Sequence, residues 1–304
     1  MHSQKNRQRI DYLLDTYLEK GLVFRNYSMV TVKSYRFTWK VILKLSKAEY
    51  LDELTTECLE DVFYQGRKER QWSSTTLHSY FAKTNPFLKW CVKQGYLSCN
   101  PLDRVEKPRL KTRLPRKLSE TEAELVLETS YHMKYSYRYE RFRNRAIIAC
   151  MLLAGLRKSE TINLRMRDVD FDTSSLFINQ GKGGKDRNIP MCSRLKGILL
   201  SYIAERKRLN RQSVYFFTGV NEKRKFGNQA IKILMHRLRK QTGLDFSSHT
   251  LRHSFATLML EGGCDIYTLS QMMGHSKITT TTIYLQCTTK QKRKSIELHA
   301  LNHN

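Results

Sequence analysis

The sequence predicts a mainly α-helical protein with a small antiparallel β insertion, in which a helical N-terminal domain precedes a larger C-terminal one. Apolar residues recur at helical spacing along most of the 304 residues. Three short strand-like runs surround a glycine-rich turn between residues 169 and 190, and three prolines interrupt residues 100–117. Because a single hydrophobic core stops growing near roughly 250–300 residues, a chain of this length is expected to form two compact domains.

The N-terminal domain, residues 1–99, is expected to be a small, basic helical unit. Apolar positions at helical spacing predict helices over residues 9–20 and 31–47, with two more starting at Thr55-Thr56 and Ser73-Ser74. Gly21 is a plausible stop for the first helix. Pro86 should kink the fourth helix or divide it, since proline removes a backbone donor.

Residues 100–117 read as an extended basic linker, because prolines break regular structure there and cations dominate. Its cations, which are candidate partner-binding residues, are Arg104, Lys107, Arg109, Lys111, Arg113, Arg116 and Lys117. A solvated spacer without a partner is the alternative, since linkers are often charged simply to stay open.

The C-terminal domain, residues 118–287, should open with a capped helix at Ser119-Glu120-Thr121-Glu122. An apolar helix over residues 145–156 and a short one over 158–164 follow. Strands are predicted at residues 169–171, 176–178 and 187–190, which form a small antiparallel sheet. Helices resume near residues 193, 228, 249, 265 and 277, and residues 288–304 form a separate tail.

The charge balance indicates a polyanionic partner. The chain has 54 Lys and Arg against 28 Asp and Glu, which gives a formal charge of +26. So many positive charges repel one another unless an anion neutralises them. Nucleic acid is the first candidate partner, and a ribosomal or merely sticky basic protein is the alternative. The hydrophobic share of 40% favours a packed globule over a basic tail. Seven scattered cysteines without a C-x-x-C pair favour reduced thiols. With no signal-type N-terminus and no apolar run of membrane length, a cytoplasmic protein without membrane contact is expected.

Two motifs could suggest other chemistry. His249 and His253 have the spacing of a zinc pair, but Thr250 stands where metalloproteases carry glutamate, so no metal site is expected. The run Gly181–Asp186 resembles a phosphate loop without its Ser/Thr and first Gly, which leaves a hairpin tip that carries Lys182.

A third set of residues indicates one kind of chemistry when its members are taken together, although each residue alone has an ordinary structural explanation. Alone, Arg157 could pair with Glu160 for structure, and Tyr284 could be a core aromatic. Together, two arginines, two or three histidines, a lysine and a tyrosine can break a phosphodiester without a metal. Arginines neutralise the transition state, the tyrosine attacks, and a lysine or histidine protonates the leaving oxygen.

These residues resemble the tyrosine recombinases, also called phage integrases. The resemblance lies in Ala154–Glu160, in Gly181-Lys182-Gly183 with Arg187 and Pro190, in His249-x-x-Arg252-His253, in Leu269 through His275, and in Tyr284. It covers nearly the whole chain, whose compact length is similar to that of bacterial Xer-type recombinases. One departure is Leu285-Gln286-Cys287, where family members often carry Thr or Ser and a His.

The resemblance implies a role for each matched residue. Tyr284 would be the nucleophile that forms a 3′-phosphotyrosyl link, and Arg157 and Arg252 would hold the scissile phosphate. His249 and His275 would complete the pocket, Lys182 would be the general acid, and Glu160 would orient the first arginine. The family needs neither ATP nor a divalent metal, so no cofactor is expected.

The resemblance also implies an assembly. Residues 1–99 would be a core-binding domain, residues 118–287 the catalytic domain, and the two would clamp double-stranded DNA at a recombination site. A homo-tetramer on two sites is expected, with residues 288–304 docking on a neighbouring protomer, and a partner recombinase or accessory protein is possible. The alternatives are a topoisomerase-like strand relaxer, a non-catalytic DNA-binding protein of the same fold and, for the tail, a frayed terminus.

Overall fold

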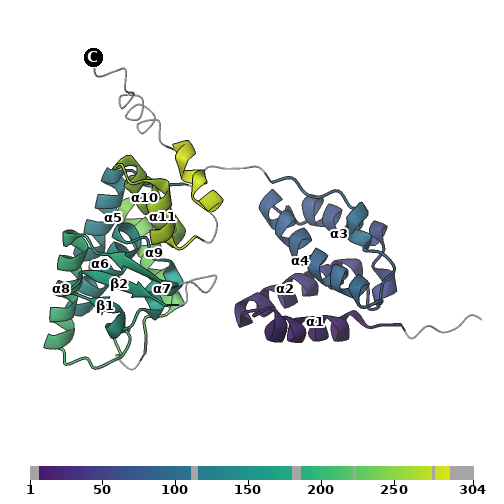
Figure 1. Cartoon of the computed structure of the whole chain (residues 1–304), viewed down its shortest axis with the longest axis horizontal. Coiled ribbons are helices and arrows are strands. Elements are labelled where there is room, and N and C mark those ends of the chain that lie inside the picture. The colour runs from purple at the N-terminus through teal and green to yellow at the C-terminus, as the bar shows by residue number, and fades with distance from the viewer. Residues whose placement is uncertain (1–6, 111–115, 180–185, 222–223, 276–277, 288–304) are drawn as a thin grey trace, which may run out of the picture. The chain divides into compact units, whose positions relative to one another are not determined.

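The computed structural model describes residues 7–110, 116–179, 186–221, 224–275 and 278–287 (Figure 1). The chain divides into two compact units, Met1–Arg113 and Leu114–Asn304. Helices dominate both units, and the strands form one three-stranded antiparallel sheet in the second. The predicted fold class is confirmed. No helix in the described ranges is long and apolar enough to cross a membrane.

The first unit is built from α-helices with apolar faces turned inward. They are α1 (Ile10–Phe24), α2 (Met29–Ser46), α3 (Thr56–Lys68) and α4 (Ser74–Lys93), with short 3₁₀ turns at Leu51–Glu53 and Pro101–Arg104 (Figure 1). Trp39 and Phe87 are fully buried at its centre, with ring centroids 4.7 Å apart. Thr55 and Ser73 cap α3 and α4, each accepting a backbone N–H three residues on, which explains where both helices begin.

Two helix details differ from the expectation. α1 continues past Gly21 to Phe24, and the glycine is needed for contact: a Cβ there would overlap the ring of Tyr27. α4 continues as one helix through Pro86, so the proline does not divide it. The buried side chains of Phe87, Leu88 and Cys91 hold its second half in the core, and this packing outweighs the lost backbone donor.

The basic segment after residue 99 begins as ordered structure. Pro101–Arg104 forms a 3₁₀ turn in which the Asn100 side chain accepts the N–H of Leu102 at 3.1 Å. Leu102 is buried in the core of the first unit. The prolines therefore do not prevent regular structure at the start of this segment. Arg104, Lys107 and Arg109 are exposed.

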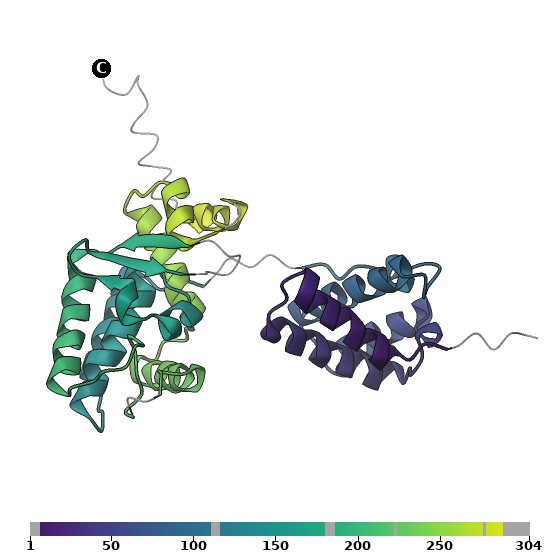
Figure 2. The same cartoon turned by 60° about the horizontal axis from the view of Figure 1, so that its bottom comes forward.

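The second unit surrounds a helix whose second half contains a stretch that is buried on every side. Its α-helices are α5 (Glu120–His132), α6 (Arg138–Leu153), α7 (Lys158–Asn163), α8 (Ser193–Arg208), α9 (Asn228–Thr242), α10 (Ser248–Glu261) and α11 (Ile266–Met273). Every residue of α6 from Ala146 to Met151 has an exposed fraction of 0%. A helix that is apolar all round must be covered on every side, and α5, α8 and α10 pack against α6 (Figure 2).

The sheet lies between α7 and α8 in the chain, with strand order β1-β2-β3. The strands are β1 (Val169–Asp170), β2 (Ser175–Ile178) and β3 (Arg187–Pro190). Leu176 pairs with Ile189, and Ile178 pairs with Arg187. This register places Arg187 at the start of β3, soon after residues 180–185, which lie outside the described ranges.

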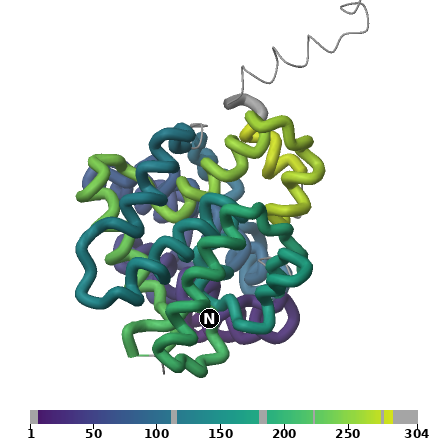
Figure 3. Tube along the Cα trace, turned by 90° about the vertical axis from the view of Figure 1, so that its left-hand side faces the viewer, coloured from purple at the N-terminus to yellow at the C-terminus, as the bar shows by residue number. Residues whose placement is uncertain are grey.

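The chain's last described segment forms a small core of its own with α10 and α11 (Figure 3). The members of this C-terminal cluster are Phe255, Ala256, Leu260, Leu269, Met273 and Tyr284. The helix expected from residue 277 is replaced by two 3₁₀ turns, Ile278–Thr280 and Thr282–Cys287. The tighter winding turns Tyr284 inward, where its side chain packs with this cluster.

Candidate active site

The junction between α6 and α7 positions the first arginine. Gly155 adopts φ +61°, a conformation that favours glycine, and a Cβ there would overlap the ring of Phe255. The chain then reverses so that Arg157 stands at the start of α7. Its Nη1 donates to Oε1 of Glu160 at 2.8 Å, and its Nη2 donates to the carbonyl of Gly274 at 3.1 Å. This one side chain thus joins α7 to the end of α11.

Glu160 is the anionic centre of the site. Its side chain is 6% exposed and accepts hydrogen bonds from Arg157 and from Arg187, whose Nη2 lies 2.7 Å from Oε2. Burial opposes ionisation of this carboxyl group, but the hydrogen bonds and charges of Arg187 and Arg157 outweigh burial and lower its pKa to about 2. Glu160 is therefore ionised at neutral pH.

Arg252 on α10 is the most enclosed cation of the site. It is 5% exposed, and it donates to the carbonyls of Gly155 and Met273. Its Nη1 lies 3.9 Å from the Glu160 carboxylate. Burial, and next the charge of Arg157, lower the pKa of Arg252 to about 9, so it stays protonated at neutral pH.

His275 follows the left-handed cap of α11. Gly274 has φ +61°, and a Cβ there would come within 3.0 Å of the Arg187 side chain. The Nδ1 atom of His275 lies 2.8 Å from the hydroxyl of Thr281. Burial and then the charges of Arg252, Arg157 and Arg187 lower the pKa of His275 to about 4, so its imidazole is neutral at pH 7.

Tyr284 is in direct contact with a histidine. Its hydroxyl oxygen lies 2.6 Å from Nδ1 of His253, and the two ring centroids are 5.5 Å apart. The tyrosine is 2% exposed. The hydroxyl is thus held inside the C-terminal cluster, next to the helix that carries Arg252.

The structure brings together most of the residues that the sequence singled out. Arg157, Glu160 and Arg252 share one network through the end of α11, and His275 lies close enough for the charges of Arg252 and Arg157 to lower its pKa. His249 is exposed in the first turn of α10. Lys182 lies outside the described residues, as do Lys111 and Arg113 of the basic segment.

Two residues of the network were not among the candidate site residues. Arg187 binds Glu160 and also donates from Nε to the carbonyl of Met272 at 2.8 Å, and His253 contacts Tyr284. Both residues belong to the sequence motifs that carry the family resemblance, so the sequence did contain a signal for them. Assigning them needed the strand register and the turn that buries Tyr284.

Two cations of the basic segment already have acidic partners in the second unit. Arg116 pairs with Asp245 at 2.7 Å, and the Nζ of Lys117 lies 2.6 Å from Oε1 of Glu261. Arg104, Lys107 and Arg109 remain exposed. These three are the described cations of the segment best placed to meet a polyanion.

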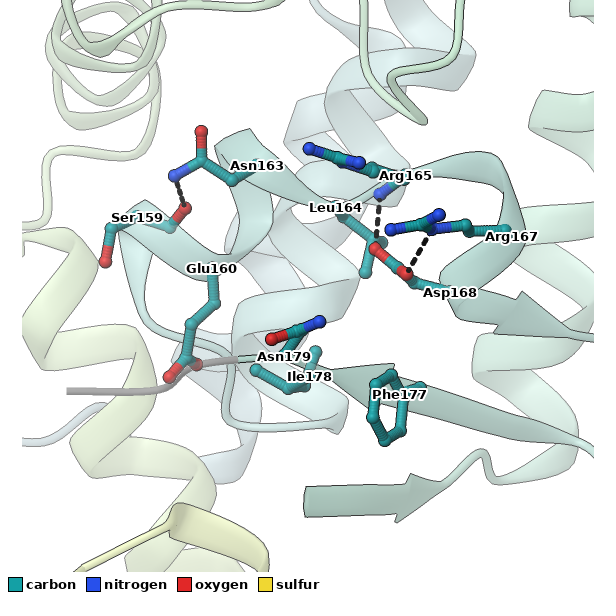
Figure 4. Close-up of a pocket in the computed structure, with 10 residues that line it drawn as sticks. All are labelled: Ser159, Glu160, Asn163, Leu164, Arg165, Arg167, Asp168, Phe177, Ile178 and Asn179. Carbon is teal, nitrogen blue, oxygen red and sulfur yellow. Dashed lines mark hydrogen bonds and ion pairs between the residues drawn. The ribbon is translucent and has the colours of Figure 1, made fainter. Parts of the chain in front are cut away.

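A pocket of about 440 Å³ lies beside the network, between α7 and β2 (Figure 4). Glu160 stands on one side of it and Arg165 and Arg167 on the other. The Asp168 carboxylate accepts the Arg165 backbone N–H at 2.8 Å. The pocket shares Glu160 with the network but not the histidines or Tyr284, so the arginine and histidine groups, rather than this pocket, mark the candidate active site.

The network carries an excess of positive charge. Three guanidinium groups surround one carboxylate, and all four side chains are at most 19% exposed. Excess cationic charge in a partly desolvated site favours an anion such as a phosphate, and the arginine forks match its oxygens. Of the three arginines, Arg157 is the most exposed, at 19%. The arrangement can therefore bind a phosphate beside a tyrosine hydroxyl.

Comparison with known proteins agrees with this chemistry. The phage integrase family matches residues 117–291. Tyrosine recombinase XerA of Pyrococcus horikoshii is 36% identical over 197 residues, which are 64% of this chain and 65% of that protein. A tyrosine recombinase of Thermosipho africanus is 25% identical over 297 residues, 95% of this chain and 99% of that protein. The crystal structure of XerH site-specific recombinase bound to palindromic difH substrate has a TM-score of 0.73 at 21% identity, covering 94% of this chain and 83% of that one.

The helical fold with its antiparallel hairpin, together with the family match and the curated relatives, places the chain in the class of the tyrosine recombinases. The chain belongs to the phage integrase family.

Proposed function

We propose that the protein is a site-specific DNA recombinase that cuts and rejoins strands through a 3′-phosphotyrosyl intermediate. The observation that carries this proposal is the buried network of Arg157, Arg187 and Arg252 around a single carboxylate, in the same unit as Tyr284. The family match supports it, as does the likeness to a recombinase solved on its DNA substrate. A formal charge of +26 suits a protein that covers many phosphates.

The chemical step uses side chains alone. Arg157 and Arg252 bind the non-bridging oxygens of the scissile phosphate, with His249 and His275 completing the pocket. The hydroxyl oxygen of Tyr284 attacks phosphorus, and the 5′-oxygen leaves with a proton from Lys182. The new phosphotyrosyl ester keeps the energy of the broken bond, so rejoining by a DNA hydroxyl needs no ATP. Neither step calls for a divalent metal or another cofactor.

Glu160 has a supporting role in this scheme. Its carboxylate fixes Arg157 and Arg187 in one arrangement before DNA arrives, which reduces the ordering needed in the transition state. Its ionised state also lowers the repulsion among the three guanidinium groups. It does not contact the DNA itself.

Recombination between two sites implies an assembly. We assign residues 1–99 to a core-binding domain and residues 118–287 to the catalytic domain, which together clamp one recombination site, with residues 100–117 crossing the DNA backbone. A dimer forms on each site and a tetramer on two, and residues 288–304 dock on a neighbouring protomer. A partner recombinase or an accessory protein can join, and the protein acts in the cytoplasm.

The biological role is either resolution of chromosome or plasmid dimers, or integration and excision of a mobile element. Mapping the cleaved sites in the native genome separates these roles. A topoisomerase-like relaxer would instead act on a single site without a tetramer, so a requirement for two sites excludes it. A non-catalytic DNA-binding protein would form no covalent adduct at all.

The decisive experiment is a nicked suicide duplex that carries the cognate site. The native chain should form a denaturation-resistant protein–DNA adduct, and Tyr284→Phe should abolish it while DNA binding persists. An adduct that survives this substitution would show that another residue is the nucleophile.

A further inference from the structure

The contact between His253 and Tyr284 raises the question of where the hydroxyl proton goes. Tyr284 must lose that proton to attack phosphorus, and its unperturbed pKa of about 10 leaves it protonated at neutral pH. The hydroxyl oxygen lies 2.6 Å from Nδ1 of His253, a distance typical of a strong hydrogen bond. A general base must lie within this reach of the proton it removes.

The surroundings of His253 keep its imidazole neutral. His249 and Arg252 face it from its own helix, α10; Tyr284 faces it from the 3₁₀ turn Thr282–Cys287, and His275 from beyond α11. Burial, followed by the charges of His249 and Arg252, lowers the pKa of His253. A neutral imidazole has one nitrogen free to accept a proton. Phenol is the stronger acid of the pair and imidazole the stronger base, which favours Nδ1 as the acceptor.

The position of His253 links the tyrosine to the residues that bind the phosphate. It follows Arg252 directly on α10, so the residue that holds the tyrosine and a residue that holds the phosphate belong to one rigid helix. Thr257 donates to the backbone carbonyl of His253 one turn further on. The part-buried imidazole of His275, in the same unit, directs its Nδ1 to Thr281 instead.

We propose that His253 is the general base that removes the hydroxyl proton of Tyr284. As the bond between the tyrosine oxygen and phosphorus forms, the proton passes to Nδ1 and His253 becomes an imidazolium. The bond from phosphorus to the 5′-oxygen breaks, and that oxygen takes its proton from the general acid. In rejoining, the DNA hydroxyl attacks, and His253 returns the proton to the departing tyrosine oxygen. This assignment rests on the proposed function and adds a residue to it.

The test is the rate of adduct formation on the suicide duplex in single turnover, measured from pH 5 to 9. His253→Asn can still accept a hydrogen bond near the position of Nδ1, but an amide cannot take a proton. It should cleave about 100-fold more slowly at pH 7, the scale on which a general base acts. The deficit should shrink as pH rises, because hydroxide then supplies the tyrosine anion. Added imidazole should restore much of the rate of His253→Ala.

The control is His236→Asn, the same substitution at an exposed position on α9, which should keep the native rate and pH profile. If His253→Asn also keeps them, His253 only positions the tyrosine and the proposal is wrong. A ring-nitrogen NMR spectrum of the native protein adds a test without substitution: Nδ1 of His253 should be unprotonated at pH 7, and a protonated Nδ1 would overturn the assignment. Loss of the adduct in Tyr284→Phe tests the nucleophile separately, so the two assignments can fail independently.

Discussion

The carboxylate of Glu160 accepts two hydrogen bonds from the guanidinium group of Arg187, at 2.7 and 3.0 Å, although the residues are 27 positions apart. Both side chains are at most 7% exposed. The pair ties α7 to the first residue of β3. It also lies at the centre of the network that holds Arg157 and Arg252.

We expect Glu160→Gln to destabilise the second unit by about 3 kcal/mol, because it leaves buried guanidinium groups without their counter-charge. Trp39, Trp72 and Trp90 are the chain's three tryptophans, and all lie in the first unit. Denaturant unfolding followed by tryptophan fluorescence should therefore be unchanged, while the far-ultraviolet circular dichroism transition of the second unit moves to lower denaturant.

Glu124→Gln is the matched control for that change. Glu124 pairs with Arg194 at 2.5 Å, but both side chains are 46% exposed. Loss of an exposed pair should cost no more than about 1 kcal/mol. Equal effects of the two substitutions would contradict a special role for the Glu160 network.

Stability should depend on pH through His275. Its pKa in the folded protein is about 4, against about 6.5 when unfolded, so the unfolded chain binds the proton first as pH falls. The stabilisation is complete above pH 6.5 and is lost as pH falls toward 4. His275→Asn should flatten the dependence of unfolding free energy on pH in this window by up to one proton. An unchanged slope would show that other groups govern it.

Lys182→Ala should slow strand cleavage, because the 5′-oxygen then leaves without its proton. A duplex with a bridging 5′-thiolate leaving group should restore most of the rate, since a thiolate needs no general acid. Cleavage rates on the oxygen and sulfur substrates give the comparison. Without recovery on the sulfur substrate, the acid would have to be a histidine.

The exposed cations before the second unit should contribute to DNA affinity through phosphate contacts. Replacing Arg104, Lys107 or Arg109 by Gln should each reduce the slope of log binding constant against log salt by about 0.9. Lys117→Gln is the control, because its ammonium group is paired with Glu261. Equal slopes in all four variants would show that these three cations do not contact the DNA phosphates.

Deletion of residues 290–304 should leave binding to a single site intact and abolish cooperative assembly on two sites. Native gel shifts with one-site and two-site DNA distinguish the two effects. Unchanged cooperativity would mean that the tail does not dock on a neighbouring protomer.

The sequence predicted the fold class because amphipathic periodicity and the glycine-rich hairpin are local signals. It also predicted that Arg157, Glu160, Arg252 and His275 belong together, through motifs whose order matches a family. The bond between Glu160 and Arg187 was beyond reach, since it depends on the register of β2 and β3. Tyr284 alone could be read as a core aromatic, and its side chain is buried, but the helix expected from residue 277 was wrong because 3₁₀ turns form there.

The C-terminal cluster around Tyr284 is separate from the main core of the second unit. A small cluster can open locally at a fraction of the free energy of global unfolding. If Tyr284 is the nucleophile, we expect its exposure to be a conformational equilibrium, in which every 1.4 kcal/mol of packing within those six side chains changes the exposed population about tenfold. In this sense, the hydrophobic contacts of the C-terminal cluster would set how often Tyr284 is exposed.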